Sequence, residues 1–311
     1  MLSKAETQGL GGFVRLLPAE RMMLVFIAIV GLLAVTLALV MQRQVNWPPF
    51  LGGYVATVAL AMIGGYVRQV KSAPRVGLAL VGAGIFTGFT AVSSIFIFAL
   101  FPLANPLIDP LLLNIDAALG YHWPGLIAWL ADYPTLAQGL GYVYHSSLIQ
   151  ILLTIVLLAT LSRDLDLHRF LLVGIVTLIL AVAIWWTVPS IGPSAFQQIP
   201  EAHRLATGLY YSPAYGEFLR TLVEVGPRQI SPEVITGVVA FPSYHMIMAL
   251  MVVWFTRGTL AFLPAALVNT AMIPATLSHG GHHLVDLIAG LAVFTLGVWI
   301  ANRLIRAEPQ T

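Results

Sequence analysis

A histidine pair, His282 and His283, stands close to an aspartate in the stretch SHGGHHLVDLIAG (278–290). His282 and Asp286 are four residues apart, which on a helix places both side chains on one face, about 6 Å apart along the axis. A carboxylate there accepts a hydrogen bond from one ring nitrogen, fixes the tautomer and leaves the other nitrogen as a nucleophile or base. The alternative is a buried pair with no further role. The residues that follow are apolar, as in a membrane helix, where ionisable groups are costly and usually functional. The spacing therefore favours a catalytic pair.

Two glycines, Gly280 and Gly281, precede the pair. Glycines before a helix expose backbone N–H groups and let an anion approach closely. Without the neighbouring histidine and aspartate, a simple turn would be the better interpretation. Beside them, Gly281 becomes a candidate phosphate-binding residue.

A second polar cluster opens the apolar run AFPSYHMIMAL (240–250). Pro242 and Ser243 suit the first turn of a helix, whose N-terminus is a natural seat for phosphate. His245 lies just inside the run and could protonate a leaving oxygen, with Ser243 as a phosphate ligand. Alone, this histidine would more often be structural. The interpretation rests on its expected position beside the His282–Asp286 pair.

Three arginines, Arg204, Arg220 and Arg228, lie in the long polar loop at about 189–239 that leads into this cluster. The guanidinium group suits anions with several oxygens because its planar fork donates two hydrogen bonds at once. Loop solubility and contact with lipid head groups are the alternatives. Arg220 ranks first because its surroundings, EFLRTLVEVG (217–226), are apolar and typical of a helix.

Zinc is the alternative to a phosphate anion as the ligand of this site, because histidine and aspartate side chains commonly coordinate zinc. No HExxH motif and no cysteine is present, and arginines beside the site would repel a cation. We therefore expect no metal and no other cofactor. The net charge of +2, with no dense basic run, gives no indication of a nucleic-acid partner.

The elements that must position these residues are membrane helices. Hydrophobic residues make up 59% of the 311 and charged residues only 9%, against roughly 25% in a soluble domain. Several apolar runs reach the roughly 20 residues needed to cross a bilayer. The sequence predicts an all-α polytopic bundle with about eight spans near 22–41, 50–67, 77–103, 137–161, 168–188, 240–256, 258–277 and 284–302. The segment 106–135, broken by Pro, Gly and Asp, is expected to form interfacial or re-entrant helix.

The distribution of basic residues in the short loops predicts the orientation. If the N-terminus is cytoplasmic, eleven of the 15 Lys and Arg residues fall inside, from Lys4 to Arg306. Only Arg43 and the three loop arginines fall outside. Both termini are then cytoplasmic, and the two polar clusters meet on the outer face of the cell membrane.

These residues resemble the type-2 phosphatidic acid phosphatase superfamily of membrane lipid phosphatases, which uses a Pro-Ser-x-His block and a later His-x-x-x-Asp block. Here the blocks are 242–245 and 282–286, and the phrases FPSYH and GGHHLVDLIAG look closest to inositol phosphorylceramide synthases and their bacterial relatives. The resemblance implies a six-span core at 77–303, an accessory segment with two spans at 1–76 and a tail at 304–311. It implies that His282 is a nucleophile that forms a phosphohistidine, that Asp286 orients it and that His245 protonates the leaving alkoxide.

The chain departs from the family pattern at several positions. The first family block, a lysine followed by Arg-Pro, is not visible, and the Ser-Arg that opens the third block is replaced by Ala275 and Thr276. The loop arginines are the candidates to replace the missing cations. His279 and His283 are additional, and His283 stands where an aromatic residue is expected in this branch.

The predicted function is a lipid-phosphate phosphatase, or a phosphotransferase that delivers the phosphoryl group to an alcohol acceptor. Polar residues in YVYHSSLIQ (142–150) are candidates for an acceptor or head-group site, although helix packing through small polar residues is the better explanation. Two alternatives stay open. One is a transporter with a His/Asp proton relay, which would place ionisable groups at mid-bilayer. The other is an inactive family member.

Overall fold

The structure is a computed structural model that describes residues 14–306. Lys4 and most of the predicted tail at 304–311 lie outside the described residues. Nearly all regular structure within 14–306 is helical, which confirms the predicted all-α bundle.

Within residues 14–306 a helix or helix pair lies in each of the eight predicted stretches, and five or six of them are long and apolar enough to span a membrane. Five helices are long and apolar enough to cross a membrane: α1 (Pro18–Val40), α2 (Trp47–Val70), α3 (Pro74–Ala99), α8 (Asp164–Thr187) and α13 (Leu284–Leu304). The predicted fourth span is a pair bent by 52°, made of α6 (Pro134–His145) and α7 (Ser147–Thr160). The remaining two, α11 (Tyr244–Thr256) and α12 (Phe262–Ser278), are apolar but shorter, with 13 and 17 residues. Large apolar side chains such as Leu32, Leu33 and Val55 are exposed on the outer helices. Such surfaces suit lipid, and the chain is a membrane protein.

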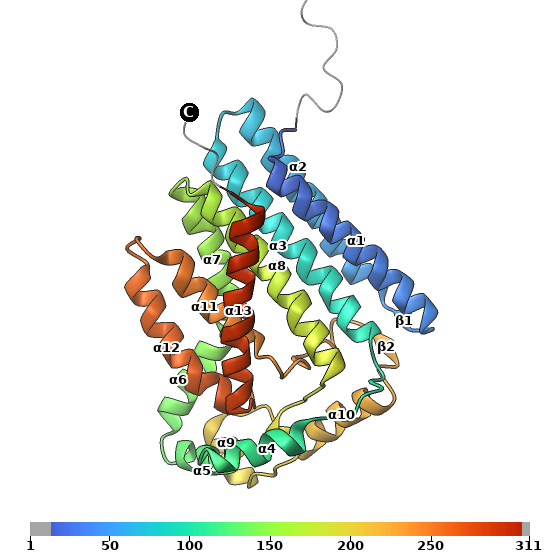
Figure 1. The fold of residues 1–311 in the computed structure, drawn as a ribbon, viewed down its shortest axis with the longest axis vertical. Coiled ribbons are helices and arrows are strands. Elements are labelled where there is room, and N and C mark those ends of the chain that lie inside the picture. The colour runs from blue at the N-terminus through green and yellow to red at the C-terminus, as the bar shows by residue number, and fades with distance from the viewer. Residues whose placement is uncertain (1–13, 307–311) are drawn as a thin grey trace, which may run out of the picture.

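A layer of short helices covers one end of the bundle (Figure 1). It consists of α4 (Asp109–Ala118), α5 (Trp123–Ala131), α9 (Glu201–Thr207) and α10 (Pro213–Glu224), with the short 3-10 helix η2 (Pro193–Ala195). The first two come from the broken apolar segment at 106–135, and the others come from the long loop after α8. The start of α1 and the end of α13 lie at the opposite end of the bundle (Figure 1). The layer therefore covers the end where α13 begins.

The first two helices pack on α3 and are tied to the rest by polar contacts at both ends. At one end the buried carboxylate of Glu20 in α1 accepts hydrogen bonds from Arg68 of α2, at 2.7 and 2.8 Å, and lies 3.3 Å from Nε2 of His168 in α8. At the other end β1 (Gln44–Val45) pairs in parallel with β2 (Gln229–Ile230), which belongs to the long loop. These contacts fix the N-terminal helices against the part of the chain that carries both polar clusters.

Candidate active site

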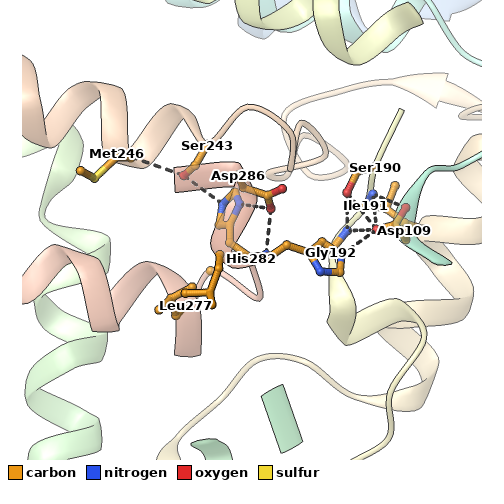
Figure 2. A network of polar contacts seen from close by, with 12 residues as sticks. Asp109, Ser190, Ile191, Gly192, Ser243, Met246, Leu277, His282 and Asp286 are labelled. Atoms are coloured by element: carbon orange, nitrogen blue, oxygen red, sulfur yellow. Dashed lines mark hydrogen bonds and ion pairs between the residues drawn. The ribbon is translucent and has the colours of Figure 1, made fainter. Parts of the chain in front are cut away.

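The histidine–aspartate pair forms at the N-terminus of α13, as the spacing predicts. Nδ1 of His282 lies 3.0 Å from Oδ2 of Asp286, and both side chains are buried (Figure 2). His283 is the N-cap residue of α13 and Asp286 is the third residue of the helix, so its carboxylate reaches back to accept the His283 N–H at 2.9 Å. The carboxylate is therefore held by the backbone as well as by the ring, and Nε2 of His282 is left with its lone pair.

The second cluster meets the first across a short gap. Ser243 is the N-cap of α11, where its hydroxyl accepts the Met246 N–H, and the same hydroxyl lies 3.5 Å from Nε2 of His282 (Figure 2). The rings of His245 and His282 have centroids 6.4 Å apart. The ring of Tyr144 in α6 stacks on that of His245 with centroids 4.1 Å apart. The structure thus brings His245, His282, Asp286 and Ser243 into one site.

A cavity of about 170 Å³ opens onto both histidines. Tyr144, Tyr211 and Gly280 form its polar wall, while Ser94, Ile97, Leu178 and Tyr244 also line a second, mostly apolar cavity of about 170 Å³ inside the bundle. This second cavity lies among α3, α7, α8 and α11. The polar site and the apolar interior are therefore adjacent, with a shared wall.

The glycine turn before His282 is held tightly from two sides. Gly281 has φ +56°, in the left-handed region that favours glycine. Tyr211 donates a hydrogen bond of 2.6 Å to the carbonyl of Gly280. The backbone of Gly192 lies so close that a Cβ there would collide with the carbonyl oxygen of Gly281. The turn is thus a rigid wall of the site.

The predicted arginines lie elsewhere in the layer of short helices. Arg204 and Arg220 line a separate polar cavity of about 90 Å³, and Tyr211 lies between it and the histidine cavity. Arg204 is paired with Glu201 at 2.6 Å, and Arg220 donates to the carbonyl of Ala195. Arg228 is exposed just before β2 and lines neither of these two cavities.

Sequence reasoning missed two buried carboxylates, Asp109 and Asp116, on α4. Asp116 lies 2.6 Å from Nδ1 of His283, and Asp109 lies 3.3 Å from Nε2 of the same ring. The signal was their spacing of seven in an otherwise apolar segment, which puts both on one face of a helix. His279 has a different setting, with hydrogen bonds to the Ser278 hydroxyl at 3.0 Å and the Thr207 carbonyl at 3.3 Å. Burial lowers the pKa of His279, as expected for a neutral residue that links α12 to α9.

Comparison with known proteins places the chain in a family. A sequence model described as the PAP2 superfamily matches residues 110–300, well over half of the chain. The chain belongs to the PAP2 superfamily. No curated protein and no solved structure matches it. PAP2 membership supports phosphatase or phosphotransferase activity, and the matched range contains both histidine blocks as well as Asp116.

This PAP2 protein has small residues where the family block places Ser-Arg. Ala275 and Thr276 are both fully buried in the last turns of α12, and Thr276 Oγ1 has no hydrogen-bond partner. Within residues 14–306 no group of three or more His, Asp or Glu side chains is arranged to hold a metal ion.

Proposed function

We propose that this PAP2 protein is a lipid-phosphate phosphatase or phosphotransferase that acts through a phosphohistidine intermediate. The observation that carries the lipid assignment is the shared wall between the histidine cavity and the apolar cavity. A substrate whose phosphate contacts His282 and whose hydrocarbon chain lies among α3, α8 and α11 would fill both. Apolar ligand groups gain free energy in such a cavity in rough proportion to the apolar area removed from water.

The reaction follows from the tautomer that Asp286 imposes. Nε2 of His282 attacks phosphorus with its lone pair, and the bond from phosphorus to the leaving oxygen breaks. His245, which lines the same cavity, donates a proton to that oxygen, so that an alcohol leaves and the phosphoryl group stays on His282. Water or an alcohol then attacks phosphorus, returns its proton to His245 and frees His282. Asp286 offsets the positive charge that develops on the ring.

Phosphate binding is proposed for the groups closest to Nε2 of His282. The Ser243 hydroxyl lies 3.5 Å from that nitrogen at the N-terminus of α11, where the helix dipole favours an anion. Gly281 contributes through the turn that shapes the wall. Arg204 and Arg220 lie behind Tyr211 and are assigned to the distal part of the head group or to an acceptor.

The site is proposed to face the outside of the cell membrane. The loops at the end of the bundle where α13 ends carry the basic residues Lys71, Arg75 and Arg163, and such loops are retained in the cytoplasm. The layer of short helices then covers the outer end. This position also weakens the transporter alternative, because His282 and Asp286 lie at the end of α13 and not at its middle.

Phosphate release from labelled lipids tests the proposal. Purified protein in nanodiscs is given ³²P-labelled phosphatidic acid and polyprenyl diphosphate in the presence of EDTA, alone or with an added diol. We expect release or transfer that survives EDTA and is lost in His282→Ala. His122→Ala is the matched control, because His122 is exposed at the start of α5, outside the site. An inactive wild type, or activity that EDTA abolishes, would contradict the proposal.

A further inference from the structure

The ring of His283 is clamped between two carboxylates that no part of the reaction uses. Nδ1 lies 2.6 Å from Oδ2 of Asp116 and Nε2 lies 3.3 Å from Oδ1 of Asp109. The side chains of His283 and Asp109 are fully buried, and that of Asp116 is 4% exposed. A neutral imidazole has one N–H, so both nitrogens can donate only when the ring carries a second proton. The geometry therefore describes an imidazolium ion held between two anions.

This arrangement of His283 between Asp109 and Asp116, called the His283 clamp below, is connected to His282 through the backbone. Oδ2 of Asp286 accepts both the N–H of His283, at 2.9 Å, and Nδ1 of His282, at 3.0 Å. Asp116 also accepts the N–H of Leu284, at 3.1 Å, and so caps the first turn of α13. A shift of residue 283 would therefore move the carboxylate that orients the His282 ring.

Asp109 extends the same network to the other side of the site. Its carboxylate accepts the Ser190 hydroxyl at 2.9 Å and the backbone N–H groups of Ile191 and Gly192 at 3.2 and 2.8 Å (Figure 2). Gly192 in turn lies against the carbonyl of Gly281. One carboxylate thus fixes the loop that presses on the glycine turn before His282.

We infer that His283, held as a cation by Asp109 and Asp116, is a positioning residue. It holds the His282–Asp286 pair in the orientation needed for attack on phosphorus. This inference rests on the proposed function. His283 does not itself line the histidine cavity, so its effect is exerted through Asp286 and the turn. A displacement of about 1 Å at a nucleophile costs on the order of 100-fold in rate.

The charge on His283 gives the inference a pH signature. The groups facing the ring are Asp109 and Asp116 from α4 and Asp286 from α13, with His282 and Tyr121 nearby. Burial lowers the pKa of His283, but the hydrogen bonds to Asp109 and Asp116 outweigh it and raise the pKa to about 9. Above that pH the neutral ring keeps one N–H, and one of the two carboxylates loses its hydrogen bond from the ring. Activity should therefore fall on the alkaline side as the clamp opens.

The test compares kcat, KM and the pH profile of phosphate release for wild type, His283→Gln, Asp116→Asn and Asp109→Asn. The asparagine variants remove charge and keep an acceptor for the backbone donors. We expect kcat to fall about 10- to 100-fold with KM within about threefold. The alkaline limb near pH 9 should vanish in His283→Gln and move to lower pH in Asp116→Asn. Asp132→Asn, an exposed aspartate after α5, is the matched control and should behave as wild type.

The outcomes separate this inference from the proposed function. A wild type that releases no phosphate from any lipid defeats the proposed function and the inference with it. An active wild type alongside a folded His283→Gln that keeps kcat and its alkaline limb overturns the inference alone. Folding is followed by size-exclusion profile and Tm. If His283→Gln does not fold, the asparagine variants decide, and failure of all three to fold would show a purely structural role and overturn the inference.

Discussion

Nδ1 of His282 donates a hydrogen bond of 3.0 Å to Oδ2 of Asp286, in a setting where the carboxylate is fully buried. The bond decides which ring nitrogen can react, because a proton on Nδ1 leaves the lone pair on Nε2. That nitrogen lies 3.5 Å from the Ser243 hydroxyl, and His245 lines the same cavity, with its ring centroid 6.4 Å from that of His282. The proposed chemistry rests on this single orientation.

Replacement of His245 tests its role as the proton donor. In His245→Gln we expect turnover of an alkyl lipid phosphate to slow about 100- to 10,000-fold, because the alkoxide must leave without a proton. An aryl phosphate, whose leaving oxygen is far less basic, should lose much less. Kinetics with both substrates measure the difference, and an equal loss for the two would show that His245 is not the acid.

Chain-length dependence tests the shared wall between the cavities. Leu178 lines both, so Leu178→Trp should obstruct the passage from the histidines to the apolar interior. We expect KM for a long-chain lipid phosphate to rise about tenfold or more, while a short, water-soluble phosphate ester is turned over as in wild type. Leu148→Trp, at a position that lines only the apolar cavity, is the comparison and should have a smaller effect on lipids of intermediate length. If Leu178→Trp affects both substrates equally, the chain binds elsewhere.

The separate arginine cavity predicts an effect on binding. In Arg220→Gln we expect KM to rise several-fold with kcat nearly unchanged, because Arg220 lies behind Tyr211 and away from the transferring phosphate. Arg228→Gln should have less effect than Arg220→Gln, since Arg228 lines neither cavity. If Arg220→Gln instead slowed turnover about 100-fold at saturating substrate, the guanidinium would act at the reacting phosphorus.

The motif residues could be predicted from the sequence because each block is local. A spacing of four sets His282 against Asp286, and Pro242 and Ser243 were expected in the first turn of the following helix, which in the structure begins one residue later, with Ser243 as its N-cap. The partners of His283 could not be predicted in the same way, because Asp116 is 167 residues away and meets it only when α4 packs over the start of α13. The helical spans follow from hydropathy alone.

The positions of the loop arginines depend on tertiary packing. The sequence analysis grouped Arg204, Arg220 and Arg228 as candidate phosphate ligands because all three lie in one loop that is predicted to be outside the membrane. The loop folds into η2, α9, α10 and β2, so that Arg204 and Arg220 line one cavity away from the histidines and Arg228 lies apart, just before β2. The i,i+3 spacing of Glu201 and Arg204 is compatible with a pair on one helix, whereas the contact of Arg220 with the Ala195 carbonyl depends on how the loop packs.

Thermal stability should fall at alkaline pH because of His283. Its pKa is raised in the folded state from the ordinary 6.5 to about 9, so folding favours the protonated ring. The stabilisation is fully present below about pH 6.5 and is lost as pH rises through 9. We expect a lower Tm at pH 10 than at pH 7 in wild type and a smaller decrease in His283→Gln. Equal decreases in the two proteins would show that another group titrates.

Direct detection of the intermediate tests the central claim. Wild type, His282→Ala and Asp286→Asn are mixed with ³²P-labelled lipid phosphate, quenched in alkaline detergent within milliseconds to seconds, and the labelled peptide is identified by mass spectrometry. We predict acid-labile, base-stable phosphate on His282 in wild type, none in His282→Ala, and much slower labelling in Asp286→Asn. Label on another residue, or turnover without labelled protein at any time, would contradict the account.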